Sequence, residues 1–147
     1  MTYDVRVKKL RDNATVPTYG SEFAAGADLY AAVDGAVTIG AGETKLIPTG
    51  IALEIPVGFA GLIYARSGLA CKRNLAPANK VGVVDSDYRG EVMVALHNHG
   101  KDAQTIEAGE RIAQMVIAPY VTASFILSDE LDDTVRGEGG FGSTGRK

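Results

Sequence analysis

The sequence lacks the features that mark membrane-bound, disulfide-bonded and nucleic-acid-binding proteins. Its 15 lysines and arginines face 18 aspartates and glutamates, so the formal charge is −3 and the pI is near 5.3. Proteins that follow a phosphate backbone carry a basic patch, so any phosphate binding here must be local. The single cysteine, Cys71, cannot form an internal disulfide, and the N-terminus shows no apolar signal region or membrane span. We therefore expect a cytoplasmic protein with neither nucleic acid nor membrane as a partner.

A long stretch with the 3.6-residue period of an amphipathic helix is also missing, and strand signals take its place. Residues 3–8 alternate apolar and polar side chains with a period of two, which is typical of a half-buried strand. Glycine and proline separate later apolar runs, at 45–55, 59–65, 92–96 and 112–117. We predict an all-β barrel or jelly roll with one short helix, from Ser67 to about Arg73. With 147 residues, 46% of them hydrophobic, the chain suits a single domain spanning 1–147.

The last dozen residues, 136–147, differ from the rest because they carry five glycines and a lone aromatic residue, Phe141. The run 137–142 fits the G-x-G-x-x-G pattern of a dinucleotide site, but only five residues follow it, and that site needs a helix there. A disordered terminus explains the glycines. A mobile tail that folds over a ligand also gives Phe141 a partner, by stacking on a base, with Arg136, Ser143 and Thr144 on a phosphate.

The run 82–90 is unusual because two carboxylates and an aromatic residue interrupt the end of an apolar strand. If the strand continues, Asp85 and Asp87 point to one face and Tyr88 to the other, and such a face can hold a water or a cation. Asp-Ser-Asp is also good turn chemistry, with Gly90 ending a hairpin. The residues alone leave both interpretations open.

A helix that starts at Ser67, directly after a strand, offers a second place for chemistry. The Ser67 hydroxyl can cap the helix while the backbone N–H groups of residues 67–69 face outward, an arrangement that attracts phosphate. Arg66 supplies a matching positive charge, and Gly68 lets a ligand approach the backbone closely. An ordinary N-cap beside a surface arginine is the alternative.

Five segments, in order, carry a resemblance to a known family. They are Ala-Gly-Ala-Asp-Leu-Tyr-Ala-Ala at 25–32, Ala-Arg-Ser-Gly-Leu-Ala at 65–70, the run at 82–90, Gly-Glu-Arg-Ile-Ala-Gln-Met-Val at 109–116, and the glycine-rich tail at 136–145. With all five, the chain resembles the homotrimeric dUTPases, the dUTP nucleotidohydrolases. The resemblance implies a jelly-roll-like subunit of the β-clip type, three of which close around a threefold axis. It also implies an enzyme that hydrolyses dUTP to dUMP and pyrophosphate.

The resemblance implies a base and a metal ion. Asp85 matches the carboxylate that orients and deprotonates the water attacking the α-phosphorus, and Asp87, two positions away, is the alternative base. Mg²⁺ is the expected ion, bridging the phosphates. Asp28 resembles the residue that reaches this ion through water, although an aspartate that merely opens a strand is the alternative. The lack of a dense carboxylate cluster suits a metal held mostly by phosphates and water.

Nucleotide contacts are implied as well. Asn79 resembles the residue that binds uracil, together with backbone groups of Val83 and Val84, although an ordinary turn also explains Asn79. Tyr88 matches a tyrosine that packs beneath the sugar and leaves no room for a 2′-hydroxyl, and Met93 lies near the base or sugar. The phosphate and tail contacts complete the set: Arg66, Ser67, Gly68, Gln114, Arg136, Phe141, Gly142, Ser143 and Thr144.

Two other functions remain as alternatives. The dCTP deaminases resemble dUTPases in fold but carry a catalytic glutamate on the strand after the aspartate motif, where this chain has Val-Met-Val-Ala-Leu at 92–96. A trimeric nucleotide-binding module without turnover is the alternative outside the enzymes, but it has no evident use for a base such as Asp85. His97 and His99 share one strand face, yet zinc requires further ligands that the sequence does not offer, so we expect ordinary strand or interface histidines.

Overall fold

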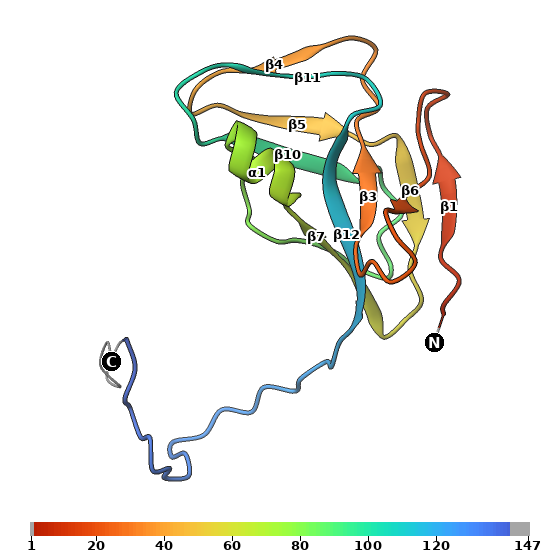
Figure 1. Cartoon of the computed structure of the whole chain (residues 1–147). Coiled ribbons are helices and arrows are strands. Elements are labelled where there is room, and N and C mark those ends of the chain that lie inside the picture. Colours follow the sequence, from red (N-terminus) through yellow and green to blue (C-terminus); the bar gives the residue numbers. More distant parts are fainter. Residues whose placement is uncertain (1, 142–147) are drawn as a thin grey trace.

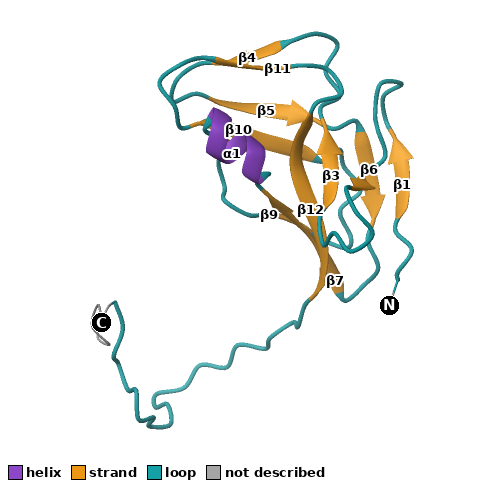
Figure 2. Cartoon of the chain, in the orientation of Figure 1, coloured by secondary structure: helices purple, strands orange, loops and turns teal. Residues whose placement is uncertain are grey.

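The computed structural model describes residues 2–141, which form twelve short strands and one helix (Figure 1). The strands are β1 (Arg6–Lys9), β2 (Thr18–Tyr19), β3 (Ala27–Tyr30), β4 (Val37–Ile39), β5 (Thr44–Pro48), β6 (Ile51–Glu54), β7 (Phe59–Tyr64), β8 (Leu75–Pro77), β9 (Gly82–Val84), β10 (Met93–Asn98), β11 (Gln104–Ile106) and β12 (Arg111–Pro119). The helix, α1, spans Ser67–Arg73 (Figure 2). The predicted all-β fold with one short helix is confirmed, and the helix has the predicted bounds.

The strands of the described chain pair in antiparallel fashion and build two sheets and two further strand pairs. The larger sheet has the order β2-β3-β12-β7-β9, and the smaller has the order β5-β10-β8. β1 pairs with β6, and β4 pairs with β11. The long strand β12 lies in the middle of the larger sheet, between β3 and β7, as Figure 1 shows. β9 is an edge strand of the same sheet.

The register of β12 determines which side chains share a face of the larger sheet. Gln114 lies opposite Asp28 on β3 and Tyr64 on β7. Met115, the next residue, lies opposite Ala27. Cross-strand partners point to the same face, and neighbours along a strand point to opposite faces. Asp28, Gln114 and Tyr64 therefore form a row on one face, and Met115 and Ala27 lie on the other.

Aliphatic side chains from the two sheets, the two strand pairs and the loops between them fill the core. The largest fully buried ones are Leu29, Ile39, Ile47, Ile51, Ile55, Leu75, Leu96, Ile106 and Ile112. Each such side chain stabilises the fold by roughly 1.5–3 kcal/mol relative to leaving it exposed. The core is therefore the main source of stability, and the polar side chains discussed below are arranged around it.

Gly50 divides the apolar run predicted at 45–55 into β5 and β6. Its φ is +69°, in the left-handed region that favours glycine. A Cβ atom at this position would come within 2.7 Å of the Ala14 Cβ and 3.0 Å of the Ala32 Cβ. Both its conformation and its surroundings therefore require glycine at this corner.

Helix α1 is anchored at its C-terminal end. The Arg73 Nε donates to the Gln104 side chain at 3.0 Å, and the same guanidinium also donates to the Glu110 carboxylate and the Thr105 carbonyl. The helix ends at Asn74, whose φ is +55° and whose N–H donates to the Leu69 carbonyl. These contacts hold α1 against β11 and the turn that precedes β12.

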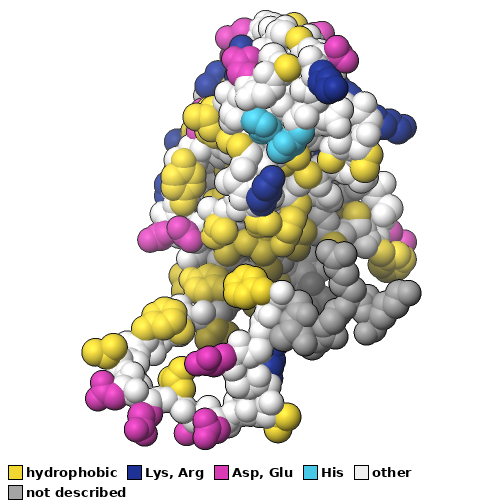
Figure 3. All heavy atoms as spheres, turned by 90° about the vertical axis from the view of Figure 1, so that its left-hand side faces the viewer, with side chains coloured by type: hydrophobic (Ala, Val, Ile, Leu, Met, Phe, Trp, Pro, Cys, Tyr) yellow, Lys and Arg dark blue, Asp and Glu magenta, His cyan; other side chains and the backbone are white. Residues whose placement is uncertain are grey.

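Beyond β12 the described chain leaves the strands and extends away from them (Figures 1 and 2). Its last backbone hydrogen bond to the body, among the described residues, runs from the Tyr120 N–H to the Gly58 carbonyl at 3.0 Å. Apolar and acidic side chains follow one another on this segment, and Phe125 and Leu127 are both 97% exposed (Figure 3). Among residues 2–141, no helix has the length and hydropathy to cross a membrane.

Asn98 is fully buried, and its side chain joins three segments of backbone. Its Nδ2 donates to the carbonyls of Ile39 at 3.0 Å and Asp102 at 2.8 Å, and its Oδ1 accepts the Gly100 N–H at 2.9 Å. We expect Asn98→Ala to lower the free energy of unfolding by about 2–3 kcal/mol, because buried polar groups lose their partners. Urea unfolding at one fixed protein concentration measures this.

The matched control is Asn13→Ala. Asn13 is exposed and makes one side-chain hydrogen bond, from Nδ2 to the Val33 carbonyl at 3.0 Å. Its replacement should cost less than about 1 kcal/mol. An equal loss of stability in the two variants would contradict the structural role of Asn98.

Candidate active site

Asp85 lies directly after edge strand β9, where the chain turns away from the sheet. The Tyr88 N–H donates to the Asp85 carbonyl at 3.2 Å, so residues 85–88 form a turn. Of the two open interpretations, the continuing strand is excluded, because β9 ends at Val84. The chain turns here as the other interpretation requires, but β9 and β10 belong to different sheets and do not form a hairpin.

The carboxylate of Asp85 is exposed, and within residues 2–141 it makes no hydrogen bond or ion pair. An ionised carboxylate offers two acceptor oxygens, so this one is available to bind a water molecule. Asp87 is exposed in the same way. The geometry of one chain therefore offers two candidate bases and does not choose between them.

Asn79 lies in the turn between β8 and β9, three residues before Gly82. The Lys80 N–H donates to the Pro77 carbonyl at 3.1 Å, and this turn brings the Asn79 Nδ2 to 3.4 Å from the place where a Cβ of Gly82 would lie. The free edge of β9 presents backbone N–H and C=O groups that no neighbouring strand of the described chain uses. The structure thus places the Asn79 amide beside Gly82, the first residue of the strand that carries Val83 and Val84, and their shared role toward a base stays a prediction.

Tyr88 is held by the residues that follow it. Its hydroxyl donates to the Glu91 carbonyl at 3.0 Å, and its ring crosses Gly90 so closely that the ring atoms are the nearest neighbours of a Cβ built there. The Glu91 carboxylate in turn accepts from the Arg11 Nε at 3.0 Å and from the Gly50 N–H at 2.9 Å. The hydrogen bond and charge of Glu91 raise the pKa of Arg11. Tyr88 is therefore tied to the corner between β5 and β6.

The Asp28 carboxylate forms ion pairs with two arginines. Its Oδ1 accepts from the Arg66 Nε at 2.8 Å, and its Oδ2 accepts from the Arg111 Nη1 at 3.2 Å. Asp28 is only 8% exposed, so this pairing is shielded from water. The Arg66 Nη1 also donates to the Arg111 carbonyl at 3.4 Å. Arg66 is thereby aimed from the start of α1 across the ends of β3 and β12.

Ser67 does not have the predicted capping role. The N-cap is Arg66, with φ −88° and ψ 131°, and no side chain caps the helix. Ser67 is instead the first helical residue, and both it and Gly68 are exposed. The expectation of a Ser67 cap is therefore wrong, although Arg66, Ser67 and Gly68 do form one open surface segment.

Gln114 is fixed beside this segment. Its Nε2 donates to the Ala65 carbonyl at 2.9 Å, directly before Arg66. A Cβ at Gly26 would come within 2.4 Å of the Gln114 Oε1, so the absence of a side chain at Gly26 makes room for this amide. Gln114 therefore supports the backbone that leads into α1.

The protein groups suit a metal that keeps most of its own water. Within the described residues, no three histidine, cysteine, aspartate or glutamate side chains gather to form a cage. Mg²⁺ retains several waters and binds through few carboxylates plus substrate phosphates. Both oxygens of Asp28 are engaged, yet each has a second lone pair that can accept from a water. The donor set fits an ion reached through water.

The two histidines lie together on the surface in Figure 3. The ring centroids of His97 and His99 are 4.4 Å apart, and the His97 Nδ1 is 2.8 Å from the Thr44 Oγ1. Burial, followed by the charges of His97 and Lys80, lowers the pKa of His99. Among residues 2–141, no third histidine, cysteine, aspartate or glutamate joins them, and His99 lies one residue beyond the end of β10.

Asp85 and Arg66 lie far apart within one chain. β9 runs antiparallel to β7, with Ile63 opposite Gly82 and Gly61 opposite Val84. Asp85 therefore continues beyond Gly61, toward Ala60, while Arg66 lies beyond the other end of β7. Six residues at about 3.3 Å each separate those positions, which is roughly 20 Å. A single chain thus holds two half-sites, one around Asp85 and one around Arg66.

The remaining predicted residues are spread more widely. Met93, on β10, lies opposite Pro48 and is 36% exposed. Arg136 forms a local turn, in which its Nε donates to the Gly139 carbonyl at 2.8 Å, and Phe141 is fully exposed. The described tail therefore makes no contribution to either half-site of its own chain. Gly142, Ser143 and Thr144 lie outside the described residues.

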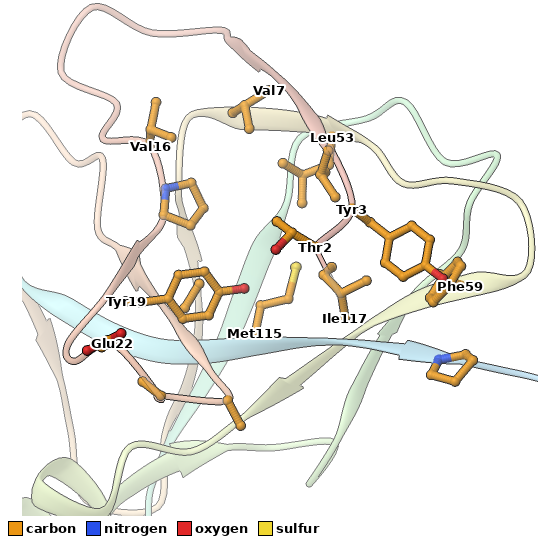
Figure 4. Close-up of a pocket in the computed structure, with 16 residues that line it drawn as sticks. Thr2, Tyr3, Val7, Val16, Tyr19, Glu22, Leu53, Phe59, Met115 and Ile117 are labelled. Carbon is orange, nitrogen blue, oxygen red and sulfur yellow. The ribbon is translucent and has the colours of Figure 1, made fainter.

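A separate apolar hollow lies on the other face of the larger sheet (Figure 4). Tyr3, Val16, Tyr19, Met115 and Ile117 are among the residues that line it. Met115 belongs to the row opposite that of Asp28 and Gln114, so this hollow is distinct from both half-sites.

Comparison with known proteins places these features in one family. The chain matches the dUTPase family model over residues 12–145. The chain belongs to the dUTPase family. The deoxyuridine 5′-triphosphate nucleotidohydrolase of Syntrophotalea carbinolica is 47% identical over 144 residues, 98% of each chain. That of Rickettsia bellii is 52% identical over 143 residues, which cover 96% of this chain and 95% of its own.

A solved dUTPase structure agrees with this assignment. The dUTPase of Staphylococcus bacteriophage 80alpha, solved with dUPNHPP, superposes with a TM-score of 0.91 at 30% identity and covers 98% of this chain and 99% of that chain. The predicted family and the jelly-roll-like β fold are confirmed. The residue roles implied by the resemblance stay predictions.

Sequence reasoning missed the contacts that hold the candidate residues in place. Arg11 and Glu91 are 80 positions apart in the sequence, and Asp28 and Arg111 are 83 positions apart. Opposite charges at such separations carry no local signal, because dozens of other pairings are equally consistent with the sequence. The one hint that the sequence of this dUTPase family member offers for these pairs is that both acidic residues, Asp28 and Glu91, lie near the ends of strands.

Asp28→Ala tests the paired arginines. The change leaves two guanidiniums close together without their shared acceptor, so we expect the free energy of unfolding to fall by about 1–3 kcal/mol. The estimate sits below that for a fully buried pair because the Arg111 side chain is 51% exposed. Asp12→Ala, at an exposed aspartate, is the control in the same urea titration. Unchanged stability in the Asp28 variant would show that the pairing is incidental.

Proposed function

We propose that this chain hydrolyses dUTP to dUMP and pyrophosphate, with Asp85 as the base that activates the attacking water. The observation that carries this is the exposed, unpaired Asp85 carboxylate at the end of a free sheet edge. Such a carboxylate can orient a water for in-line attack on the α-phosphorus, opposite the departing pyrophosphate. The reaction lowers dUTP and supplies dUMP. Membership of the dUTPase family supports the choice of substrate.

In this proposal, the backbone groups at the free edge of β9 recognise the base by hydrogen bonding. Uracil presents O2, N3–H and O4 along one side, and the Asn79 amide with backbone groups of Val83 and Val84 offers matching donors and acceptors. Cytosine reverses the pattern at two of these positions and leaves buried groups unpaired, at roughly 1–3 kcal/mol each. Tyr88 lies beneath the sugar, and Met93 lies near the base or sugar.

The second half-site binds the phosphates. Arg66 supplies charge, Ser67 and Gly68 offer exposed backbone and hydroxyl donors, and Gln114 contacts the triphosphate or its supporting loop. Asp28 keeps Arg66 extended, which lowers the entropy lost when phosphate binds. In the tail, Phe141 stacks on the base, and the γ-phosphate contacts come from Arg136, Gly142, Ser143 and Thr144.

Mg²⁺ is the proposed metal. When bound, it would neutralise charge on the phosphates and so assist departure of pyrophosphate. Asp28 would hold the ion through a water molecule. The chain's own contribution is otherwise to position the substrate and to accept the proton at Asp85.

The family resemblance implies a homotrimer, and the separation of the two half-sites supports sites that are shared between its subunits. A triphosphate and its nucleoside must touch Asp85 and Arg66 together, yet these lie roughly 20 Å apart in one chain by strand geometry. The chain after β12 also extends away from the strands of its own subunit (Figure 1). We therefore propose that each site combines half-sites and a tail from different subunits. The exposed Phe125, Ile126 and Leu127 support association, because apolar clusters of this kind mark contact surfaces.

Asp85→Asn tests the base. We expect it to lower kcat for dUTP by at least about 100-fold, since general-base assistance is typically worth 10²–10⁴. Asp87→Asn is the matched control, because Asp87 is an exposed aspartate in the same turn, and its activity should stay near wild type. Pyrophosphate release from dUTP with Mg²⁺ is the measurement. The reverse ranking of the two variants would move the base to Asp87.

The same assay separates the alternative functions. Ammonia released from a parallel dCTP sample would indicate deamination. Tight dUTP binding with neither product would indicate a binding module.

Mixing two inactive proteins tests the shared site. The first protein is the Asp85→Asn variant, which keeps its tail. The second is a truncated protein that ends before Arg136 and keeps Asp85. After subunit exchange, some sites in mixed trimers join an intact base to an intact tail, so pyrophosphate release should reappear while each parent stays inactive. Native mass spectrometry verifies exchange. Verified exchange without recovered activity would exclude a site shared between subunits.

A further inference from the structure

Position 90 requires glycine because a neighbouring side chain leaves no room for a Cβ atom there. The glycines with positive φ in the described chain are Gly42, Gly50, Gly58, Gly109 and Gly137, and Gly90 is not among them. Its backbone is therefore open to any L-residue. Its surroundings are not, because a Cβ there would lie 2.4 Å from the Tyr88 Oη, 2.6 Å from Cζ and 2.9 Å from Cε2.

All three of these nearest atoms belong to the Tyr88 side chain. The ring therefore passes over Gly90 at a distance that only a hydrogen on the Cα permits. Beyond Gly90 the hydroxyl reaches the Glu91 carbonyl at 3.0 Å, and Glu91 is itself fixed by Arg11 and the Gly50 N–H. The contact with Gly90 sets how close the ring lies to the backbone, and the hydrogen bond to Glu91 sets the direction in which the ring points.

We infer that Gly90 is a positioning residue that seats the Tyr88 ring and thereby sets how strongly the site prefers deoxyribose to ribose. The inference rests on the proposed function, in which Tyr88 lies beneath the sugar. A ring lifted or swung from this seat no longer fills the space that a 2′-hydroxyl needs. Specificity for the sugar then depends on a residue that itself touches no substrate.

The structure indicates that Gly90→Ala moves the ring and leaves the fold intact. Tyr88 is 45% exposed, so its side chain can turn toward solvent when a methyl group appears beneath it. Neither Gly90 nor Tyr88 belongs to the buried core. The Tyr88 hydrogen bond is replaced by one to water, which costs little at an exposed position.

The experiment compares kcat/KM for dUTP and UTP by pyrophosphate release. We expect the dUTP-to-UTP ratio to fall about tenfold in Gly90→Ala, the size of effect that a displaced wall of a binding pocket produces. Gly35→Ala is the matched control, because a Cβ there meets nothing within 4 Å and Gly35 lies in an exposed bend before β4. Its ratio should equal that of wild type. A wild-type ratio in Gly90→Ala would overturn the inference.

A double variant shows whether the effect passes through Tyr88. In a Tyr88→Ala background there is no ring to displace, so adding Gly90→Ala should leave the ratio unchanged. A further fall in the double variant would overturn the inference, since Gly90 would then act by another route.

A spectroscopic readout separates this inference from the proposed function. In wild-type protein without nucleotide, nuclear Overhauser contacts should join the Tyr88 ring protons to the Gly90 Hα, and they should weaken in Gly90→Ala. Their absence from wild type would overturn the seat itself. If the contacts are present but wild type releases no pyrophosphate from dUTP, the proposed function fails and the sugar role of Gly90 fails with it.

Discussion

The pairing of β12 with β3 on one side and β7 on the other is the constraint on which the rest of the molecule depends. Its register places Gln114 level with Asp28 and Tyr64, and so collects polar groups from three distant segments on one face. The opposite face of the same strand supplies Met115 to the core. A shift of one residue would exchange these faces, which would bury the amide of Gln114 and expose the core side chain. Site and core are therefore fixed by one set of backbone hydrogen bonds.

Some glycines in this chain are required because a neighbouring side chain occupies the place of a Cβ, and others because their φ is positive. Gly26 leaves room for the Gln114 amide, and Gly90 leaves room for the Tyr88 ring, without any unusual backbone angle at either. Gly50 combines both demands, because its φ is positive and its surroundings are crowded. The distinction matters when substitutions are interpreted. A space-making glycine displaces a side chain when replaced, whereas a positive-φ glycine strains the backbone itself.

How much the sequence revealed depended on the range of each interaction. Period-two alternation and glycine or proline punctuation predicted the runs that contain β1, β5, β6, β7, β10 and β12, because those signals arise from neighbours in the chain. The short helix at Ser67 had the correct bounds for the same reason. Strands of two or three residues, such as β2, β4, β8 and β11, were not predicted, because they are too short to show a period. The Ser67 cap failed, since a serine at a helix start can occupy either the cap or the first turn. The sequence left a strand or a turn open at Asp85, because Asp-Ser-Asp forms a turn as readily as an extended segment, and the structure has the turn.

Long-range electrostatics were beyond sequence reasoning. The resemblance implies a role toward a metal for Asp28, and what the structure shows is that Asp28 orders Arg66 and Arg111. These roles are compatible, because a carboxylate oxygen can accept from an arginine and a water together. The sequence named the residue but could not say which cations lie beside it, since that depends on the pairing of β3 with β12.

The free edge of β9 links fold to function. Exposed edges invite pairing with other chains, so proteins usually keep them short, cover them or charge them. β9 has three residues and is followed at once by Asp85 and Asp87, which makes it a poor template for another strand. A planar base needs only a few backbone groups, so an edge too short to recruit a strand is still long enough for the uracil contacts of the proposed function. The features that protect this edge from aggregation therefore also suit it to nucleotide recognition.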